Sequence, residues 1–181
     1  MIFVTVGTNE APFDRLLRAV DSLGFDDLVA QCGSSAIRPK NATCFDFLAF
    51  EQLVEYVRSA SVVITHAGVV SIAVSLANGK RPIVVPRLER YGEAVDDHQV
   101  ALGRRLEQRG LVTMVEEPAA LTHLRFAAKP PPETREMSSA LAKDLSGYLQ
   151  GLVTERQGFS KRRDAATVKG ERGEGNCLRL R

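Results

Sequence analysis

The stretch from Ser61 to Pro86 constrains the fold more than any other part of this chain. Its apolar run Val62–Ile64 is short, β-branched and uninterrupted, which is typical of a strand buried on both faces of a parallel sheet. A turn with the pattern His-x-Gly-x-x-Ser follows at 66–71, and then apolar residues at helical spacing. Gly79 is placed to end that helix, and 82–86 predicts a second buried strand. The stretch therefore predicts a parallel strand–helix–strand unit.

The turn at 66–71 is a candidate anion site. Gly68 permits close approach of a ligand to the backbone, and Ser71 stands where the helix is expected to begin. Free backbone N–H groups and the helix dipole favour an anion at such a position. Two interpretations stay open for each side chain. His66 is either a backbone-satisfied imidazole or a partner of a diphosphate oxygen, and Ser71 is either a helix cap or a phosphate ligand.

The same alternation runs through most of the chain. Strands are expected at 2–6, 28–31, 43–47, 62–64, 82–86 and 111–115, and helical segments at 13–20, 51–58, 71–77, 96–109, 119–124 and 133–152. Strands separated by helices predict an α/β fold with a single doubly wound parallel sheet, Rossmann-like in type. Ligands of such sheets bind at the carboxyl ends of the strands.

The first strand ends in another glycine turn, Gly7-Thr8-Asn9, where Thr8 and Asn9 could donate hydrogen bonds to a ligand. The turn has one glycine, so it matches neither the Gly-x-Gly-x-x-Gly fingerprint of dinucleotide enzymes nor a P-loop. A dinucleotide-dependent oxidoreductase is therefore a weak alternative.

A second polar set, Asp97, His98 and Gln99, opens the helix at 96–109. Acidic residues in a first turn often do no more than complement the helix dipole. A carboxylate and an amide two residues apart, at a junction that faces the same crevice, can also bind paired sugar hydroxyls. Both interpretations remain open.

Composition and charge exclude several functions. The 181 residues carry a net charge of +2, and from Glu155 onward eight Lys or Arg stand against four Asp or Glu. The slightly acidic remainder argues against a nucleic-acid partner. The three cysteines, Cys32, Cys44 and Cys177, are widely spaced and indicate neither a disulfide framework nor a metal site. With no secretory signal and no spanning apolar run, a cytoplasmic chain is expected. We expect one domain at 1–153 and a basic, disordered tail at 154–181.

The motifs together carry a family resemblance. His66-Ala67-Gly68-Val69-Val70-Ser71, Arg81–Pro86, Asp97-His98-Gln99 and Gly110-Leu111 resemble the C-terminal, donor-binding domain of glycosyltransferase family 28. The amino-terminal segments 3–8 and 13–16 narrow the resemblance to the short catalytic subunits of two-component transferases, eukaryotic and bacterial. It covers about Met1 to Leu152.

The resemblance implies the donor lobe of a GT-B glycosyltransferase that uses a UDP-sugar and needs neither cofactor nor metal. Gly7, Thr8, Asn9, His66, Gly68 and Ser71 would then bind the donor diphosphate, and Asp97, His98 and Gln99 the donor sugar. Related enzymes often carry an acid three places after the motif serine, where this chain has Val74.

One lobe makes half of a GT-B site. The resemblance and the chain length thus imply a membrane-attached partner subunit that binds a lipid-linked acceptor, supplies the general base, and holds this chain at the cytosolic face of a membrane. The expected activity is inverting transfer of a hexose-type sugar, GlcNAc or glucuronic acid, in exopolysaccharide or lipid-linked oligosaccharide synthesis. The alternative is a non-catalytic scaffold or nucleotide-sugar-binding subunit.

Overall fold

The structure is a computed structural model that describes residues 1–124 and 126. All of them belong to one compact unit, Met1–Glu133. The helix expected at 133–152, the tail expected at 154–181, the domain boundary at 153 and Cys177 lie outside the described residues.

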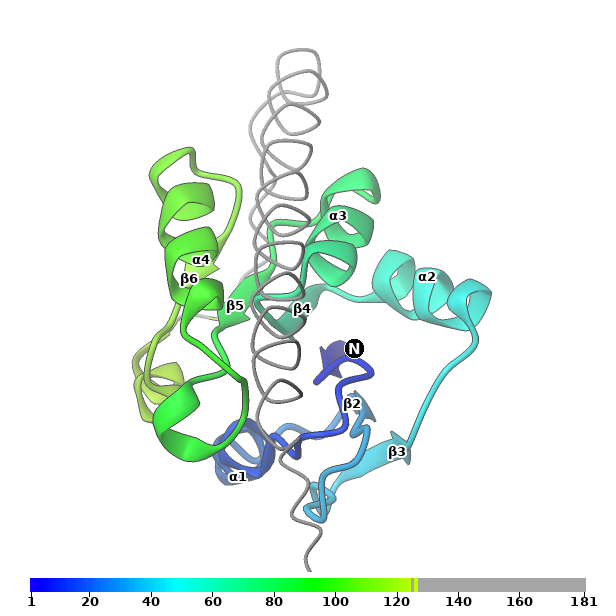
Figure 1. Ribbon diagram of the computed structural model, residues 1–181. Helices are drawn as coiled ribbons and strands as arrows, with labels where there is room; N and C mark the ends of the chain where they lie inside the picture. The colour runs from blue at the N-terminus through cyan, green and yellow to red at the C-terminus, as the bar shows by residue number, and fades with distance from the viewer. Residues whose placement is uncertain (125, 127–181) are drawn as a thin grey trace, which may run out of the picture. The chain divides into compact units, whose positions relative to one another are not determined.

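Six strands form one sheet in the order β3-β2-β1-β4-β5-β6, and every neighbouring pair is parallel (Figure 1). The strands are β1 (Ile2–Thr5), β2 (Leu28–Gln31), β3 (Ala42–Phe45), β4 (Val62–His66), β5 (Ile83–Val85) and β6 (Thr113–Met114). The predicted doubly wound parallel α/β sheet is confirmed, and the second strand has the predicted bounds. The last strand is shorter than the expected 111–115.

The described residues also form four α-helices and two 3-10 segments, and all but the last of them lie between strands. They are α1 (Asp14–Ser22), α2 (Phe50–Ser59), α3 (Val69–Ala77), η1 (Glu89–Tyr91), α4 (His98–Gln108) and η2 (Pro118–His123). The expected start of α3 at Ser71 is wrong, because Gly68, in an extended conformation, is the N-cap and the helix begins at Val69. The short helix expected at 119–124 is a 3-10 segment with proline in its first turn.

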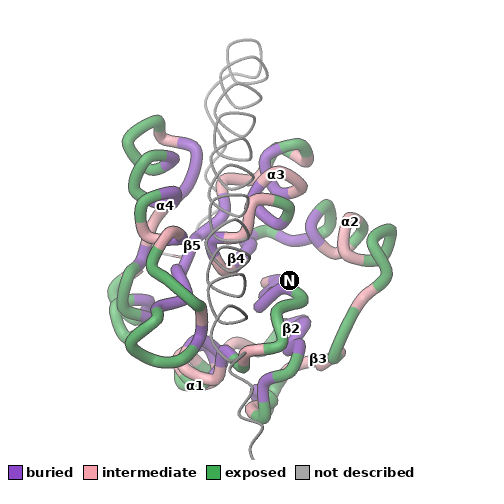
Figure 2. Tube along the Cα trace, viewed as in Figure 1, coloured by how far each residue is buried: buried purple, intermediate pink, exposed green. Residues whose placement is uncertain are grey.

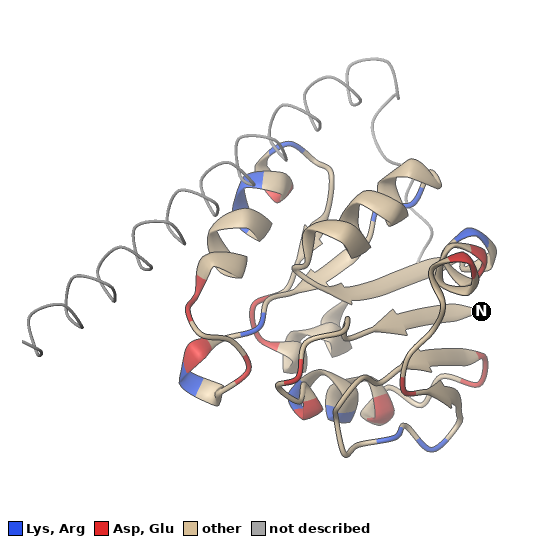
Figure 3. Ribbon diagram, turned by 45° about the vertical axis from the view of Figure 1, so that its right-hand side comes forward, with Lys and Arg blue, Asp and Glu red and all other residues tan. Residues whose placement is uncertain are grey.

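Alternation along β1 divides the core between the two faces of the sheet. Val4 packs on one face with α1, through Leu16, Leu17 and Val20 among others. Phe3 packs on the opposite face with Val57 of α2 and other buried residues. Figure 3 shows α1 below the sheet and α3 and α4 above it, with charged residues confined to helices and loops. Figure 2 shows buried residues along the central strands, whereas the edge strand β3 is not buried.

The strand order places a topological switch point between β1 and β4. From β1 the chain proceeds to β2 and β3 on one side, and from β4 to β5 and β6 on the other. Connections therefore diverge at the carboxyl ends of β1 and β4, and doubly wound sheets bind ligands at such strand ends. The two glycine turns found in the sequence follow these two strands.

Within residues 1–124 and 126, no helix combines the length and apolar character required to cross a bilayer. Cys32 and Cys44 are free thiols, and burial raises the pKa of the Cys32 thiol to about 12.

Candidate functional site

The turns after β1 and β4 meet around the imidazole of His66. β1 and β4 are neighbours in register, with Thr5 opposite Thr65, so Gly7 and His66 leave the sheet side by side. A Cβ atom added at Gly7 or at Gly68 would lie within 3.0 Å of the His66 ring. Both glycines are thus required by the close approach of their backbones to this ring. The structure brings together three of the predicted diphosphate-binding residues.

Buried polar groups hold the Gly7 turn in place. Gly7 has φ +77°, and its N–H donates to the hydroxyl oxygen of Thr5 at 3.1 Å. Its carbonyl oxygen accepts from Nε2 of Gln31 at 3.3 Å. The neighbouring Thr8 and Asn9 are exposed, and the Asn9 side-chain oxygen accepts from the backbone N–H of Ala11 at 2.8 Å. The backbone of this turn is therefore fixed, while two polar side chains remain accessible to solvent.

His66 is neutral at physiological pH. The residue is only half-buried as a whole, but its ring lies against the two glycine backbones. Burial of the ring and then the positive charge of Arg87 lower the pKa of His66 to about 4, against a hydrogen bond to the Thr5 backbone that raises it. The imidazole can thus bind a phosphate by hydrogen bonding, but a positive charge at this turn must come from another group.

The first turn of α3 follows the β4 turn directly and contributes free backbone N–H groups at the carboxyl end of this strand. Gly68 caps the helix, so Val69, Val70 and Ser71 form the first turn, where N–H groups have no partner within the helix. Ser71 is the third residue of the helix rather than its first, and it is buried. Its carbonyl oxygen accepts from the Ser75 hydroxyl at 2.7 Å. The expected helix N-terminus is present, two residues before the predicted position.

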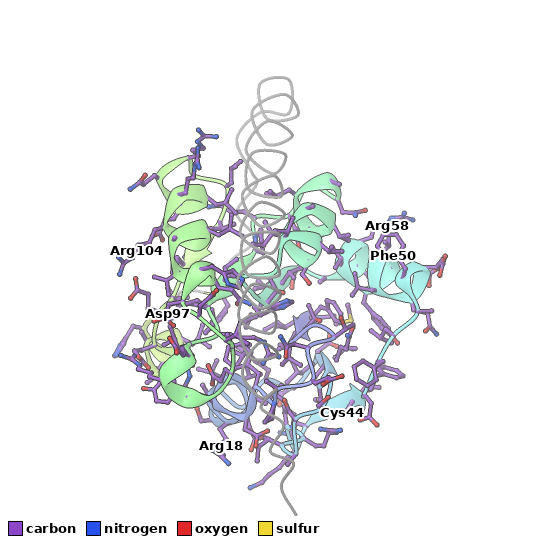
Figure 4. All side chains as sticks on the ribbon, in the orientation of Figure 1. Arg18, Cys44, Phe50, Arg58, Asp97 and Arg104 are labelled. Carbon is purple, nitrogen blue, oxygen red and sulfur yellow. The ribbon has the colours of Figure 1, made fainter. Side chains whose placement is uncertain are left out.

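Asp97, His98 and Gln99 lie at the start of α4, where Figure 4 labels Asp97. The Asp97 carboxylate accepts from the backbone N–H of Glu89 at 2.9 Å. The His98 ring contacts the Asp96 carboxylate, and hydrogen bonds from His98, backbone first, lower the pKa of Asp96. Gln99 is buried, and its side-chain oxygen accepts from the backbone N–H of Arg87 at 3.0 Å. Asp97 and Gln99 therefore shape the loop between β5 and α4.

Sequence reasoning missed the residues that hold this loop, Arg87, Glu93 and Arg15. Arg15 of α1 donates to both carboxylate oxygens of Glu93, at 3.0 and 2.8 Å, and to the carbonyl oxygen of Pro86 at 3.0 Å. Arg87 is fully buried and donates to backbone carbonyl oxygens of both the β1 turn and the loop. The stretch after Pro86 is rich in charged residues, which in the sequence gave no sign of burial.

One signal could have identified Arg87. It follows a buried strand next to β4, which is the same strand-end position that drew attention to Gly7 and His66.

A groove of about 1020 Å³ lies elsewhere, between α1, η1 and η2. Its lining includes Arg18, Tyr91 and His123 but none of the nine predicted site residues. Because backbone N–H groups at strand ends are the usual phosphate ligands, we place the candidate site at the two turns rather than in this groove.

The part of the chain that the structure describes contains no cluster of three or more His, Cys, Asp or Glu residues arranged to hold a metal ion.

The sequence is similar to those of two curated mammalian proteins. The chain is 32% identical over 123 residues to the human UDP-N-acetylglucosamine transferase subunit ALG13 and 34% identical over 122 residues to the mouse protein. Each match covers 60% of this chain but 10% of the relative, so the chain spans about a tenth of the length of these curated relatives.

Similar solved structures are glycosyltransferases. MurG of Acinetobacter baumannii shares 24% identity over 67% of this chain and 39% of its own, with a TM-score of 0.46. SnogD of Streptomyces nogalater shares 18% identity over 65% of this chain and 30% of its own, with a TM-score of 0.42. Both superpositions are partial.

The model of the glycosyltransferase family 28 C-terminal domain matches residues 1–146, which is most of the chain. This match and the two curated relatives confirm the family resemblance carried by the motifs at 66–71 and 97–99. The chain belongs to the glycosyltransferase family 28 C-terminal domain family.

Proposed function

We propose that this chain is the catalytic, donor-binding subunit of an inverting glycosyltransferase. It transfers a hexose-type sugar, GlcNAc or glucuronic acid, from a UDP-sugar to a lipid-linked acceptor in exopolysaccharide or lipid-linked oligosaccharide synthesis. Family membership supports the transferase class, and the name of the human and mouse relatives supports a UDP-sugar donor and a subunit role.

One observation carries the proposal: the packing of Gly7 and Gly68 around the His66 ring at the switch point of the sheet. A diphosphate at this position would meet the N–H groups that begin α3, the neutral imidazole, and the exposed Thr8 and Asn9. Asp97, His98 and Gln99, at the start of the next helix, are proposed to bind the donor sugar. No metal or other cofactor is proposed, since helix dipole and hydrogen bonds would stabilise the leaving diphosphate.

A partner subunit is proposed because the chain is one lobe of a two-lobe GT-B site. Large apolar side chains are exposed on segments that follow the carboxyl ends of three strands, with Val95 at 88% and Val70 at 65% exposure. Phe47 and Phe50, after β3, are also exposed. Exposed apolar side chains after these strand ends favour contact with another protein surface. The partner would bind the acceptor, supply the general base and hold this chain at the cytosolic face of a membrane.

The second candidate is a non-catalytic scaffold or nucleotide-sugar-binding subunit. Val74 is the observation that favours it, because this side chain packs against the core cluster around Phe3. An apolar group there cannot bind ribose hydroxyls as an acid would. Nucleotide binding without turnover, or no nucleotide binding, would follow.

Calorimetric titration of the purified chain, alone and co-expressed with its partner subunit, tests the proposal. We expect UDP, UDP-GlcNAc or UDP-glucuronic acid to bind with a measurable Kd, NAD not to bind, and transfer to a lipid-linked acceptor to require the partner. Absence of any sugar-nucleotide binding in the complex would favour the scaffold. Full activity of the isolated chain would contradict the proposed partner.

A further inference from the structure

Arg87 is a charged residue in a position where charge is costly. It follows Pro86 at the end of β5, and its side chain is fully buried. Its guanidinium donates to the carbonyl oxygens of Val6 and Ala11, each at 2.8 Å, and to those of Pro12 and Glu93 at 3.3 and 3.2 Å. It also lies 4.7 Å from the centre of the Phe13 ring. These hydrogen bonds all go to backbone carbonyl groups, whose dipoles solvate a cation without neutralising it.

No carboxylate pairs with Arg87 within residues 1–124 and 126. Glu93 is close enough to raise the pKa of Arg87, but its carboxylate is bound by Arg15 and by the Leu88 N–H. The Arg87 Nε atom is buried and has no hydrogen-bond partner. Burial lowers the pKa of Arg87 to about 10, so the side chain is still protonated at neutral pH. Within the described residues Arg87 is therefore a buried positive charge that no carboxylate pairs with directly.

The charge acts on the candidate donor site. Val6, whose carbonyl accepts from Arg87, directly precedes Gly7. The same guanidinium is the charged group that lowers the pKa of His66, so its field reaches the ring between Gly7 and Gly68. Since His66 is neutral, the two turns have no positive side chain of their own to offer a diphosphate.

We propose that Arg87 supplies the fixed positive charge of the diphosphate site, acting from behind the β1 turn rather than by contact with the ligand. Arg87 is then a positioning residue that shapes both the turn and its electrostatic field. A bound diphosphate provides a negative charge that no carboxylate within residues 1–124 and 126 supplies to Arg87 by direct pairing, and such charges interact strongly in a low-dielectric setting. This inference rests on the proposed donor site.

The test separates the effect of the Arg87 charge from the effect of Arg87 on the shape of the β1 turn. UDP, inorganic pyrophosphate and uridine are titrated against the wild-type chain in complex with its partner, and against the R87M and R87K complexes. R87M should weaken UDP and pyrophosphate binding at least about 30-fold and uridine binding less than about threefold. R87K keeps the charge and should weaken UDP binding less than about fivefold. The matched control is R18M, an exposed arginine on α1, and should change none of the three (Figure 4).

Equal losses of UDP and uridine binding in R87M would show that Arg87 only holds the backbone, and would overturn the inference. So would unchanged UDP binding in R87M. If R87M does not fold, the inference is tested by UDP binding to R87K and by an NMR titration of His66 in the wild type. A loss of UDP binding by R87K above about 30-fold, or a His66 that titrates near its ordinary value, would overturn the inference.

The same titrations distinguish a failure of the proposed function from a failure of the inference on Arg87. Wild-type binding of pyrophosphate, sensitive to R87M, without any binding of UDP or UDP-sugars would reject the nucleotide donor and retain the charged site. Binding of neither ligand by the wild type would reject both.

Discussion

The turn after β4 and the loop after β5 leave neighbouring strands at the same edge of the sheet, yet they are held in different ways. The β4 turn is short, and its shape depends on glycines that admit the His66 ring. The β5 loop runs from Pro86 to Asp97 and is held by side chains distant in sequence, above all Arg15, 78 positions from Glu93. The first is set by local sterics and the second by a tertiary polar network.

The difference determines which substitutions the β4 turn and the β5 loop each tolerate. A glycine turn tolerates changes elsewhere in the molecule but no added atom at its own positions. A loop held by buried ion pairs tolerates changes at its exposed positions, but loses its shape when one partner of a pair is removed. Four predictions test this contrast, in order of expected effect.

Breaking the network at Arg15 should have one of the two largest effects on stability. R15M leaves the buried Glu93 carboxylate without its bidentate partner, so the free energy of unfolding should fall by about 3 kcal/mol. Urea denaturation followed by circular dichroism measures it. The control R18M removes an exposed arginine from the same helix and should cost less than about 0.5 kcal/mol. Similar costs for both variants would mean that the ion pair does not hold the loop.

The steric origin of the β1 turn is tested by two alanine substitutions at positive φ. G7A combines a left-handed backbone with overlap on the His66 ring and should destabilise the chain by about 3 kcal/mol. G24A has a similar φ of +63° but no atom within 4 Å of the new Cβ, so about 1 kcal/mol is expected. Thermal and urea denaturation compare them, and equal costs would remove the close approach to His66 as the reason for Gly7.

His66 should make the fold sensitive to mild acid. Its pKa is about 4 when folded and near 6.5 when unfolded, so the folded chain binds fewer protons. The resulting stability is present above about pH 6.5 and is lost as the pH falls toward 4, by about 2 kcal/mol at pH 4.5. The glutamine in H66Q has no titratable group. Denaturation curves at several pH values should therefore show that H66Q loses less stability in acid than the wild type, by the amount given above. If the unfolding free energies of the wild type and H66Q changed with pH in parallel, the His66 ring would not be neutral and shielded as described.

The smallest effect is expected at Asp97. D97A removes the acceptor for the Glu89 N–H on an exposed surface and should cost about 1 kcal/mol of stability. If Asp97 binds the donor sugar as proposed, D97A should weaken UDP-sugar binding several-fold and leave UDP binding unchanged. D26A, at an exposed aspartate before β2, is the control. Equal weakening of both ligands would assign Asp97 to the loop alone.

The fold was largely predictable, because the central strands β1, β2, β4 and β5 are short buried runs that neighbouring turn residues delimit. The Gly7 and His66–Gly68 turns were identifiable for the same reason, since glycine, histidine and a helix start lie within a few residues of one another. The start of α3 was misplaced because serine at 71 is a common cap, whereas an extended Gly68 performs that function here.

Arg87 and the Arg15–Glu93 pair were not predictable in the same way. A charged side chain is normally solvated, and its burial depends on carbonyl groups supplied by segments far away in sequence. Gln99 shows the same limit, because its acceptor role toward the Arg87 backbone depends on how α4 packs.

The strand order 3-2-1-4-5-6 also has a consequence for how the chain reaches its native state. β1 is synthesised first, but its partner β4 begins about sixty residues later, so the central strand pair closes a long loop. Pairings of such high sequence separation pay their closure entropy before any stabilising contact forms, which slows folding. During translation one edge of β1 can pair with β2 early, while its other edge stays unpaired until β4 has left the ribosome.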